Sequence, residues 1–262
     1  MADAQARDTS EGLVHTCVDA EGIIEVVDDA ETRSLYFGTP AAQSAMSRRE
    51  PRSLVLPYTR YMLSALLFCR QPGRVLVLGL GGASLPRFLL NAFPSCEIDV
   101  VERRAKVVDV ARTYFQLPPS PLLRTHVMDA ARFIREWRGR PFDVVLVDLH
   151  GPDGTAPVVH DPGFFPAFAP LLGRRGVLAT NIWSGWSSSP DSIVSAHRAM
   201  FGDGHLVLPV RDRGNVILLG LPFPALSYAG ARLDARAREL EERLGVELSE
   251  FLVALALGNR RA

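Results

Sequence analysis

A glycine-rich segment and a later acid carry the clearest chemistry in this sequence. A β-prone run at Val75–Leu78 leads into Gly79-Leu80-Gly81-Gly82, which we call the glycine loop. The residues after Ser84 have a helical pattern. Glycines at a strand end let the backbone pass closely beneath a ligand, and the next helix N-terminus offers free N–H groups. Glu102 closes the following apolar run, about 20 residues beyond the glycines, where an acid accepts hydrogen bonds from ribose hydroxyls. The pair predicts a site for a ribose-bearing ligand.

Two further acids stand at the ends of predicted strands. Asp129 follows the run Thr125–Met128, and Asp148 ends the run that begins at Asp143. Together with the glycine loop and Glu102, they place four successive strand ends on one edge of the sheet, where ligands bind in open α/β folds. We therefore expect a small-molecule site at this edge.

Candidates for proton transfer follow Asp148 directly. His150 has a side chain that changes protonation near neutral pH, and the carboxylate of Asp153 would favour a positive charge developing beside it. The alternative is structural: Asp153-Gly154 forms a turn, and His150 is an ordinary loop residue. A loop rich in small residues, Ser184–Pro190, follows Trp183 and contains Trp186; the two tryptophans either cover a substrate or pack against a neighbouring helix.

Apolar runs that alternate with helical stretches predict the frame for these residues. Runs without polar alternation are typical of strands buried on both faces of a parallel sheet, and here they are Val75–Gly79, Ile98–Glu102, Asp143–Asp148 and Val177–Asn181. His205–Pro209 and Asn215–Gly220 lie too close together for a crossover helix and predict an antiparallel hairpin. The expected fold is α/β, with a Rossmann-like, mostly parallel sheet in a domain at residues 51–262.

Residues 1–50 have a different pattern. After a start expected to be disordered, short β-prone runs separated by Asp, Glu and Gly turns predict a small β-hairpin module: Leu13–Val18, Ile23–Val27, Ser34–Phe37 and, more weakly, Gln43–Met46. An isolated small sheet leaves an edge and an apolar face to cover, so we expect this module to contribute to a homodimer. Near the other end, apolar residues at helical spacing predict an amphipathic surface helix within Ala229–Leu244.

Composition limits the classes of partner. The chain has 29 basic and 29 acidic residues, so no long-range field attracts it to nucleic acid or to an anionic membrane. No apolar run approaches the length of a bilayer span. Neither the histidines nor the three cysteines have metal-ligand spacing, so no metal is expected, and we interpret Cys17, Cys69, Cys96, His126, His160 and His197 as packing or surface residues. These features favour a cytoplasmic protein with a small-molecule partner.

The segment Val75–Trp183 resembles the spermidine synthase family, closest to bacterial spermidine synthase-like proteins of uncertain substrate. The matching stretches are VLVLGLGGASLPRFL, VVE ending at Glu102, MDAARFI and FDVVLVDLHGPDGTAP. The resemblance implies a dimeric transferase that uses S-adenosylmethionine, or its decarboxylated form, as co-substrate and a small-molecule amine as acceptor. It assigns nucleoside contacts to Gly79, Gly81, Glu102, Asp129, Ala130 and Asp148, and looser acceptor contacts to Gln43 and Tyr58. It also places Asp148 at the reaction side, where we count it among the catalytic candidates with His150 and Asp153.

Two acids expected from the family are missing. Members that transfer an aminopropyl group carry an acid in the glycine loop, where this chain has Gly82, and a catalytic Asp three residues after the position of Asp148, where it has Gly151. Both acids would hold and deprotonate a cationic amine.

Their loss leaves several functions open. One is aminopropyl transfer with Asp153 or His150 as the base, and a second is methyl transfer, because without an acid at Gly82 nothing in the loop repels the carboxylate of intact S-adenosylmethionine. A third is a non-catalytic module that keeps only the nucleoside pocket. An NAD-dependent oxidoreductase is disfavoured, since Ser84 breaks the dinucleotide fingerprint and no Tyr-x-x-x-Lys pattern occurs.

Overall fold

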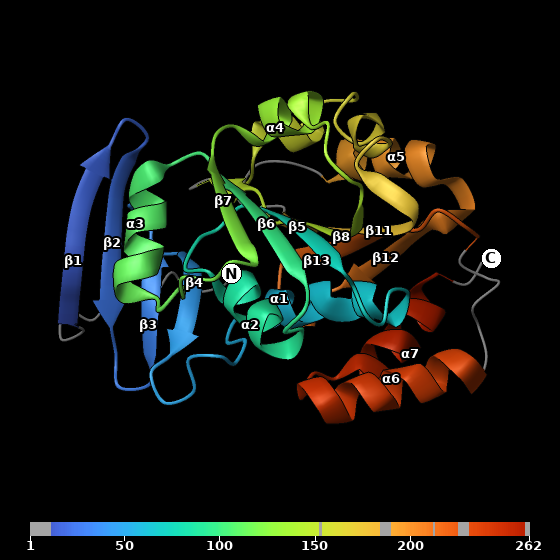
Figure 1. Ribbon diagram of the computed structural model, residues 1–262, viewed down its shortest axis with the longest axis horizontal. Coiled ribbons are helices and arrows are strands. Elements are labelled where there is room, and N and C mark those ends of the chain that lie inside the picture. The colour runs from blue at the N-terminus through green and yellow to red at the C-terminus, as the bar shows by residue number, and fades with distance from the viewer. Residues whose placement is uncertain (1–11, 152–153, 184–189, 212, 225–230, 260–262) are drawn as a thin grey trace.

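A seven-stranded sheet forms the centre of the molecule in the computed structural model, which describes residues 12–151, 154–183, 190–211, 213–224 and 231–259 (Figure 1). Its strands are β5 (Arg74–Leu78), β6 (Glu97–Glu102), β7 (Leu123–Val127), β8 (Phe142–Val147), β11 (Leu172–Trp183), β12 (His205–Pro209) and β13 (Asn215–Gly220). Their order is β12-β13-β11-β8-β5-β6-β7. The five strands from β11 to β7 are parallel, and β13 pairs antiparallel with both β11 and β12. The predicted α/β fold and the terminal hairpin are confirmed.

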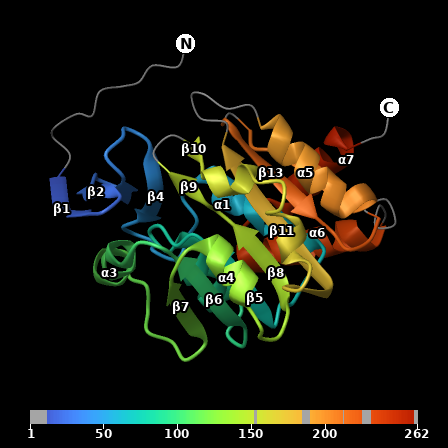
Figure 2. The same cartoon turned by 90° about the horizontal axis from the view of Figure 1, so that it is seen from above.

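Helices cover both faces of this sheet, with α4 and α5 on one face and α1, α2, α6 and α7 on the other (Figures 1 and 2). Their bounds are α1 (Pro57–Met62), α2 (Ser84–Ala92), α3 (Ala105–Tyr114), α4 (Ala130–Glu136), α5 (Asp191–Phe201), α6 (Ala231–Leu244) and α7 (Leu248–Gly258). Short 3-10 turns are η1 (Leu63–Leu67), η2 (Pro157–His160), η3 (Pro166–Phe168) and η4 (Gly202–Gly204). Because both faces are covered, every residue of β5 is buried, as its unbroken apolar pattern predicts.

Of the two C-terminal helices, α6 was predicted and α7 was not. Leu233, Ala237 and Leu240 of α6 are buried, as expected for the apolar stripe of an amphipathic helix. Helix α7, which was not predicted from the sequence, buries Phe251 and Leu255 against the same core. No helix in the described part of the chain is long and apolar enough to cross a membrane.

The N-terminal residues form a separate four-stranded antiparallel sheet in the order β1-β2-β3-β4. Its strands are β1 (Gly12–Asp19), β2 (Gly22–Asp28), β3 (Thr32–Tyr36) and β4 (Ala42–Ser47). One face of this sheet packs on α3 (Figure 1), where buried residues from both elements form one cluster: Ile24, Val26, Leu35, Met46, Val107, Val110 and Phe115. The predicted hairpins are confirmed. The boundary at residue 50 stays a prediction, and residues 1–11 lie outside the described part.

A buried arginine ties the N-terminal sheet to the glycine loop. Arg87 of α2 donates from Nε to the carbonyl of Pro51, and from Nη1 to the carbonyls of Gly82 and Phe115, at 2.5, 3.0 and 2.7 Å. Burial lowers the pKa of Arg87 to about 10. These carbonyls belong to three separate segments, so one side chain fixes the glycine loop relative to the segment that follows β4 and to the end of α3.

The glycine loop begins with a conformation that only glycine tolerates well. Gly79 has φ of +95°, in the left-handed region, and a Cβ on it would collide with the carbonyl oxygen of Asp148. The loop can therefore cross the end of β8 closely. This close approach brings the ends of β5, β6 and β8 together around one space.

The buried histidine pair at the start of β12 leads to a prediction on acid stability. The Nδ1 atoms of His197 and His205 lie 2.8 Å apart. Burial and the nearby Arg198 lower the pKa of His205 from 6.5 to about 4, and burial with the neighbouring His205 lowers the pKa of His197 well below its usual range. Below pH of about 6.5 these two histidines therefore bind protons in the unfolded chain and stay neutral in the folded chain.

We expect this pair's contribution to stability to be complete above pH of about 6.5 and to be lost as pH falls towards about 4. Urea midpoints measured between these pH values should fall steeply for the wild type. The His205→Gln variant should show a shallower slope, because one of the two groups no longer titrates. Identical slopes in the two proteins would contradict this account.

Candidate active site

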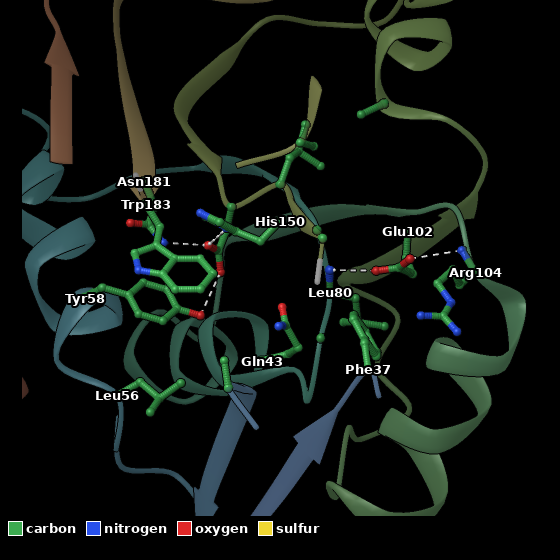
Figure 3. A pocket seen from close by; sticks show the side chains of 18 of the residues that line it. Phe37, Gln43, Leu56, Tyr58, Leu80, Glu102, Arg104, His150, Asn181 and Trp183 are labelled. Atoms are coloured by element: carbon green, nitrogen blue, oxygen red, sulfur yellow. Dashed lines mark hydrogen bonds and ion pairs between the residues drawn. The ribbon is translucent and has the colours of Figure 1, made fainter. Parts of the chain in front are cut away.

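A cavity of about 470 Å³ opens at the carboxyl edge of the central sheet, next to the N-terminal sheet (Figure 3). It is lined by the turn between β1 and β2, the chain around β4, the start of α1 and the glycine loop. The carboxyl ends of β6, β8 and β11 and the first residue of β13 also line it. The predicted site residues in the described part all line it, namely Gln43, Tyr58, Gly79, Gly81, Glu102, Asp129, Ala130, Asp148 and His150. Asp153 and Trp186 lie outside the described residues.

Glu102 closes β6 and is held by backbone donors at one end of the cavity. The N–H of Leu80 donates to its Oε2 at 3.1 Å, and the N–H of Arg104 donates to its Oε1 at 2.9 Å. Burial raises the pKa of the Glu102 carboxyl, and these two backbone hydrogen bonds oppose the rise. The carboxyl is therefore fixed beside the glycine loop, where each oxygen keeps a further lone pair for a hydroxyl donor.

Asp129 and Ala130 stand where the chain enters α4. The N–H of Arg132 donates to Oδ1 of Asp129 at 2.9 Å, which makes Asp129 the N-cap of the helix. This bond fixes the carboxylate at the mouth of the cavity. Ala130 is buried in its wall and, with only a methyl side chain, leaves room for a flat ring.

Asp148 follows β8 and is held by two side chains that Figure 3 labels, Tyr58 of α1 and Asn181 of β11. The Tyr58 hydroxyl donates to its Oδ2 at 3.1 Å, and Nδ2 of Asn181 donates to its Oδ1 at 2.9 Å. Burial, together with the negative charge of Asp148, raises the pKa of Tyr58 well above its usual range, so the hydroxyl remains a donor. Asn215 donates to Oδ1 of Asn181 at 3.0 Å and so orients its amide.

His150 completes this cluster at the same end of the cavity. Its Nδ1 lies 3.1 Å from Oδ1 of Asp148, an ion-pair distance when the imidazole is protonated. Its Nε2 is buried and has no hydrogen-bond partner among the described residues. The imidazole and the carboxylate therefore form a pair with one ring nitrogen unused, a suitable arrangement for accepting a proton.

Several lining residues were not among the predicted site residues. Asn181 lies near the end of a predicted strand, so the rule that selected Asp148 could have found it. Asn215 and Arg213 belong to the hairpin of β12 and β13, and no residue pattern marked them. Glu21 comes from the turn between β1 and β2. Trp183, considered as a substrate cover, does line the cavity.

The two glycines that replace acids of the family differ in their surroundings. A Cβ on Gly82 would lie 2.8 Å from the ring of Phe115 and 2.8 Å from Oγ of Ser44, so a side chain there points into packed protein. Gly151, in the short two-stranded sheet of β9 (His150–Gly151) and β10 (Gly154–Thr155), lines the cavity. Beyond its chain neighbours, no atom of the described residues lies within 4 Å of the place that a Cβ on Gly151 would take. Of the two positions, only Gly151 has room for an acid.

Comparison with known structures shows that the fold is similar to that of a probable spermidine synthase and of a methyltransferase-like protein. A probable spermidine synthase from Corynebacterium glutamicum superposes with a TM-score of 0.73 at 21% identity, covering 88% of each chain. Human methyltransferase-like protein 13, solved in complex with SAH, superposes with a TM-score of 0.64 at 25% identity, covering 73% of this chain and 93% of the other. No family model matches the sequence.

Sequence comparison gives the family. A polyamine aminopropyltransferase from Chromobacterium violaceum is 33% identical over 252 residues, which are 95% of this chain and 95% of that protein. The similarity therefore includes the N-terminal sheet and the C-terminal helices as well as the core. The chain belongs to the spermidine synthase family of transferases, the polyamine aminopropyltransferases.

Proposed function

We propose that this protein binds a sulfonium nucleoside, S-adenosylmethionine or its decarboxylated form, and transfers an alkyl group from it to a small-molecule amine. Glu102 would accept the ribose hydroxyls, Asp129 the adenine amino group, and Gly79 and Gly81 would lie beneath the nucleoside. Their positions after β5, β6 and β7 support this orientation. The SAH complex of the similar human methyltransferase-like protein supports a nucleoside as the ligand. Asp148 lies at the opposite end of the cavity, where the sulfonium carbon and the amine would meet.

The observation that carries the proposal is the partly buried carboxylate of Asp148, oriented by Tyr58 and Asn181 and paired with His150. The acceptor nitrogen forms its bond to carbon as the carbon–sulfur bond breaks, and that electron pair leaves with sulfur in a neutral thioether. The nitrogen gains positive charge in this step and must lose a proton. Asp148 stabilises the developing charge, and the imidazole of His150 accepts the proton.

The transferred group distinguishes the two enzymatic versions of the proposal. Identity over nearly the full length of a polyamine aminopropyltransferase favours aminopropyl transfer. The absence of an acid at Gly82 and Gly151 favours methyl transfer, or an acceptor other than a diamine, because no carboxylate at these positions holds a second ammonium. A non-catalytic nucleoside-binding module is the remaining alternative. A homodimer through the N-terminal strands stays a prediction.

One experiment separates these versions. The protein is incubated with putrescine and either decarboxylated S-adenosylmethionine or S-adenosylmethionine, and the products are identified by mass spectrometry. An aminopropylated or a methylated amine supports the corresponding enzyme. Nucleoside binding without product over a panel of amines would favour the non-catalytic module.

For an active wild type, we expect His150→Gln to lower kcat by about 10²–10⁴-fold, the usual contribution of general-base catalysis. Nucleoside affinity should stay near the wild-type value, since His150 is assigned to the proton and not to the nucleoside. The acid limb of the pH–rate profile should also change. His160→Gln is a matched control, because His160 contacts Ser192 and does not line the cavity. Unchanged kcat and pH profile in His150→Gln would assign the base elsewhere.

The two glycines give a second prediction. Gly82→Asp should cost about 1–3 kcal/mol of unfolding free energy, the usual cost of overpacking, because its Cβ meets Phe115 and Ser44. Gly151→Asp should cost much less and, if it restores an amine site, should raise turnover of putrescine. Urea unfolding of both variants beside the wild type measures the first effect. Equal stability losses in the two variants would show that the glycine loop is not packed as described.

A further inference from the structure

An arginine stands at the end of the cavity assigned to the acceptor. Arg213 lines the cavity and lies in the turn between β12 and β13, two residues before Asn215. Asn215 bonds to Asn181, which bonds to Asp148. The sheet order puts β13 and β11 on one side of β8, and β5, β6 and β7 on the other. Arg213 is therefore on the Asp148 side of the cavity, away from the residues assigned to ribose and adenine.

The positive charge of Arg213 is not balanced by an acid of the described residues. The other two arginines that line the cavity are paired, Arg103 with Glu21 and Arg104 with Asp19. Arg213 has an exposed side chain with no ion pair to any residue that the structure describes. A guanidinium carries five N–H donors in a planar fork that fits a carboxylate.

Most of the acids that line the cavity already have partners, which leaves few carboxylate oxygens to bind a second ammonium group. Glu21 pairs with Arg103, and Glu102 and Asp129 lie at the nucleoside end, where each accepts a backbone N–H. Of the described lining acids, Asp148 alone serves the acceptor end, and its oxygens already accept from Tyr58 and Asn181. Among the described residues, the far ammonium of a diamine would therefore meet a guanidinium without a matching carboxylate.

We propose that Arg213 binds a carboxylate in the active complex, so that the acceptor end of the cavity takes a carboxylate-bearing ligand and disfavours a dicationic amine. This inference rests on the proposed function and deepens it. The carboxylate has two sources. It belongs to the methionyl part of intact S-adenosylmethionine, or to an acceptor that carries an amine at one end and a carboxylate at the other.

The first arm of the test examines the donor. Isothermal titration gives the affinities of S-adenosylhomocysteine, which has the carboxylate, and of 5′-methylthioadenosine, which lacks it. If the donor supplies the carboxylate, Arg213→Gln weakens S-adenosylhomocysteine by about three- to tenfold at low salt and leaves methylthioadenosine unchanged. The loss should shrink as salt screens the pair.

The second arm examines the acceptor in protein saturated with methylthioadenosine. The probes are putrescine and 5-aminopentanoate, which has the same four methylene groups with a carboxylate in place of one ammonium. If the acceptor supplies the carboxylate, 5-aminopentanoate binds more tightly than putrescine, and Arg213→Gln removes that preference. Arg211→Gln is the matched control, since Arg211 lies in the same turn, pairs with Glu250 and does not line the cavity.

The outcomes are distinct. A loss of threefold or more in either arm, absent from Arg211→Gln and partly restored in Arg213→Lys, supports the inference and names the source. A smaller change in both arms overturns it, and the proposed function still stands if methylthioadenosine binds. Failure of the wild type to bind any of these nucleosides overturns the proposed function, and this inference with it.

Discussion

The cavity depends on the close passage of the chain after β5 over the end of β8. At Gly79 the backbone turns with positive φ, against the carbonyl oxygen of Asp148, where no side chain fits. Any larger residue would push the glycine loop away from Asp148 and separate the two ends of the site. The contact therefore joins the end proposed for the nucleoside, formed after β5, β6 and β7, to the end proposed for the reaction, formed after β8, by the last residues of β11 and at the start of β13. A donor held at one end can then present its reactive carbon at the other.

The end proposed for the reaction is built around a carboxylate that is costly to bury. A charged group removed from water must recover its lost solvation from fixed partners, and Asp148 does so through Tyr58 and Asn181. These partners come from α1 and β11, and Asn215 of β13 orients the second of them. The position of the carboxylate therefore depends on elements far apart in the sequence. Donors fixed before a substrate arrives need no reorganisation during the reaction, which is the usual source of catalytic electrostatic stabilisation.

Much of the fold, and the residues that follow the parallel strands in this site, were predictable from local pattern. The buried strands and the acids at their ends follow from apolar runs such as Val75–Leu78, because residues after parallel strands share one edge. Arg213 and Asn215 escaped prediction because β13 runs antiparallel to β11, so that its first residues, and not its last, lie at that edge. Gly82 shows the same limit. The missing acid was visible in the sequence, but the packing of Phe115 and Ser44 around it depends on how the N-terminal sheet sits on α3.

Titration of 5′-methylthioadenosine into the wild type and the Asp129→Asn variant tests the central claim, that this cavity holds a nucleoside, most directly. The amide oxygen can still cap α4, whereas the amide nitrogen would replace the carboxylate oxygen left for the adenine amino group. Losing a hydrogen bond to a charged group costs about 1.5–3 kcal/mol, so affinity should fall roughly ten- to a hundredfold with little change in stability. No binding to the wild type, or equal dissociation constants for both proteins, would contradict the account.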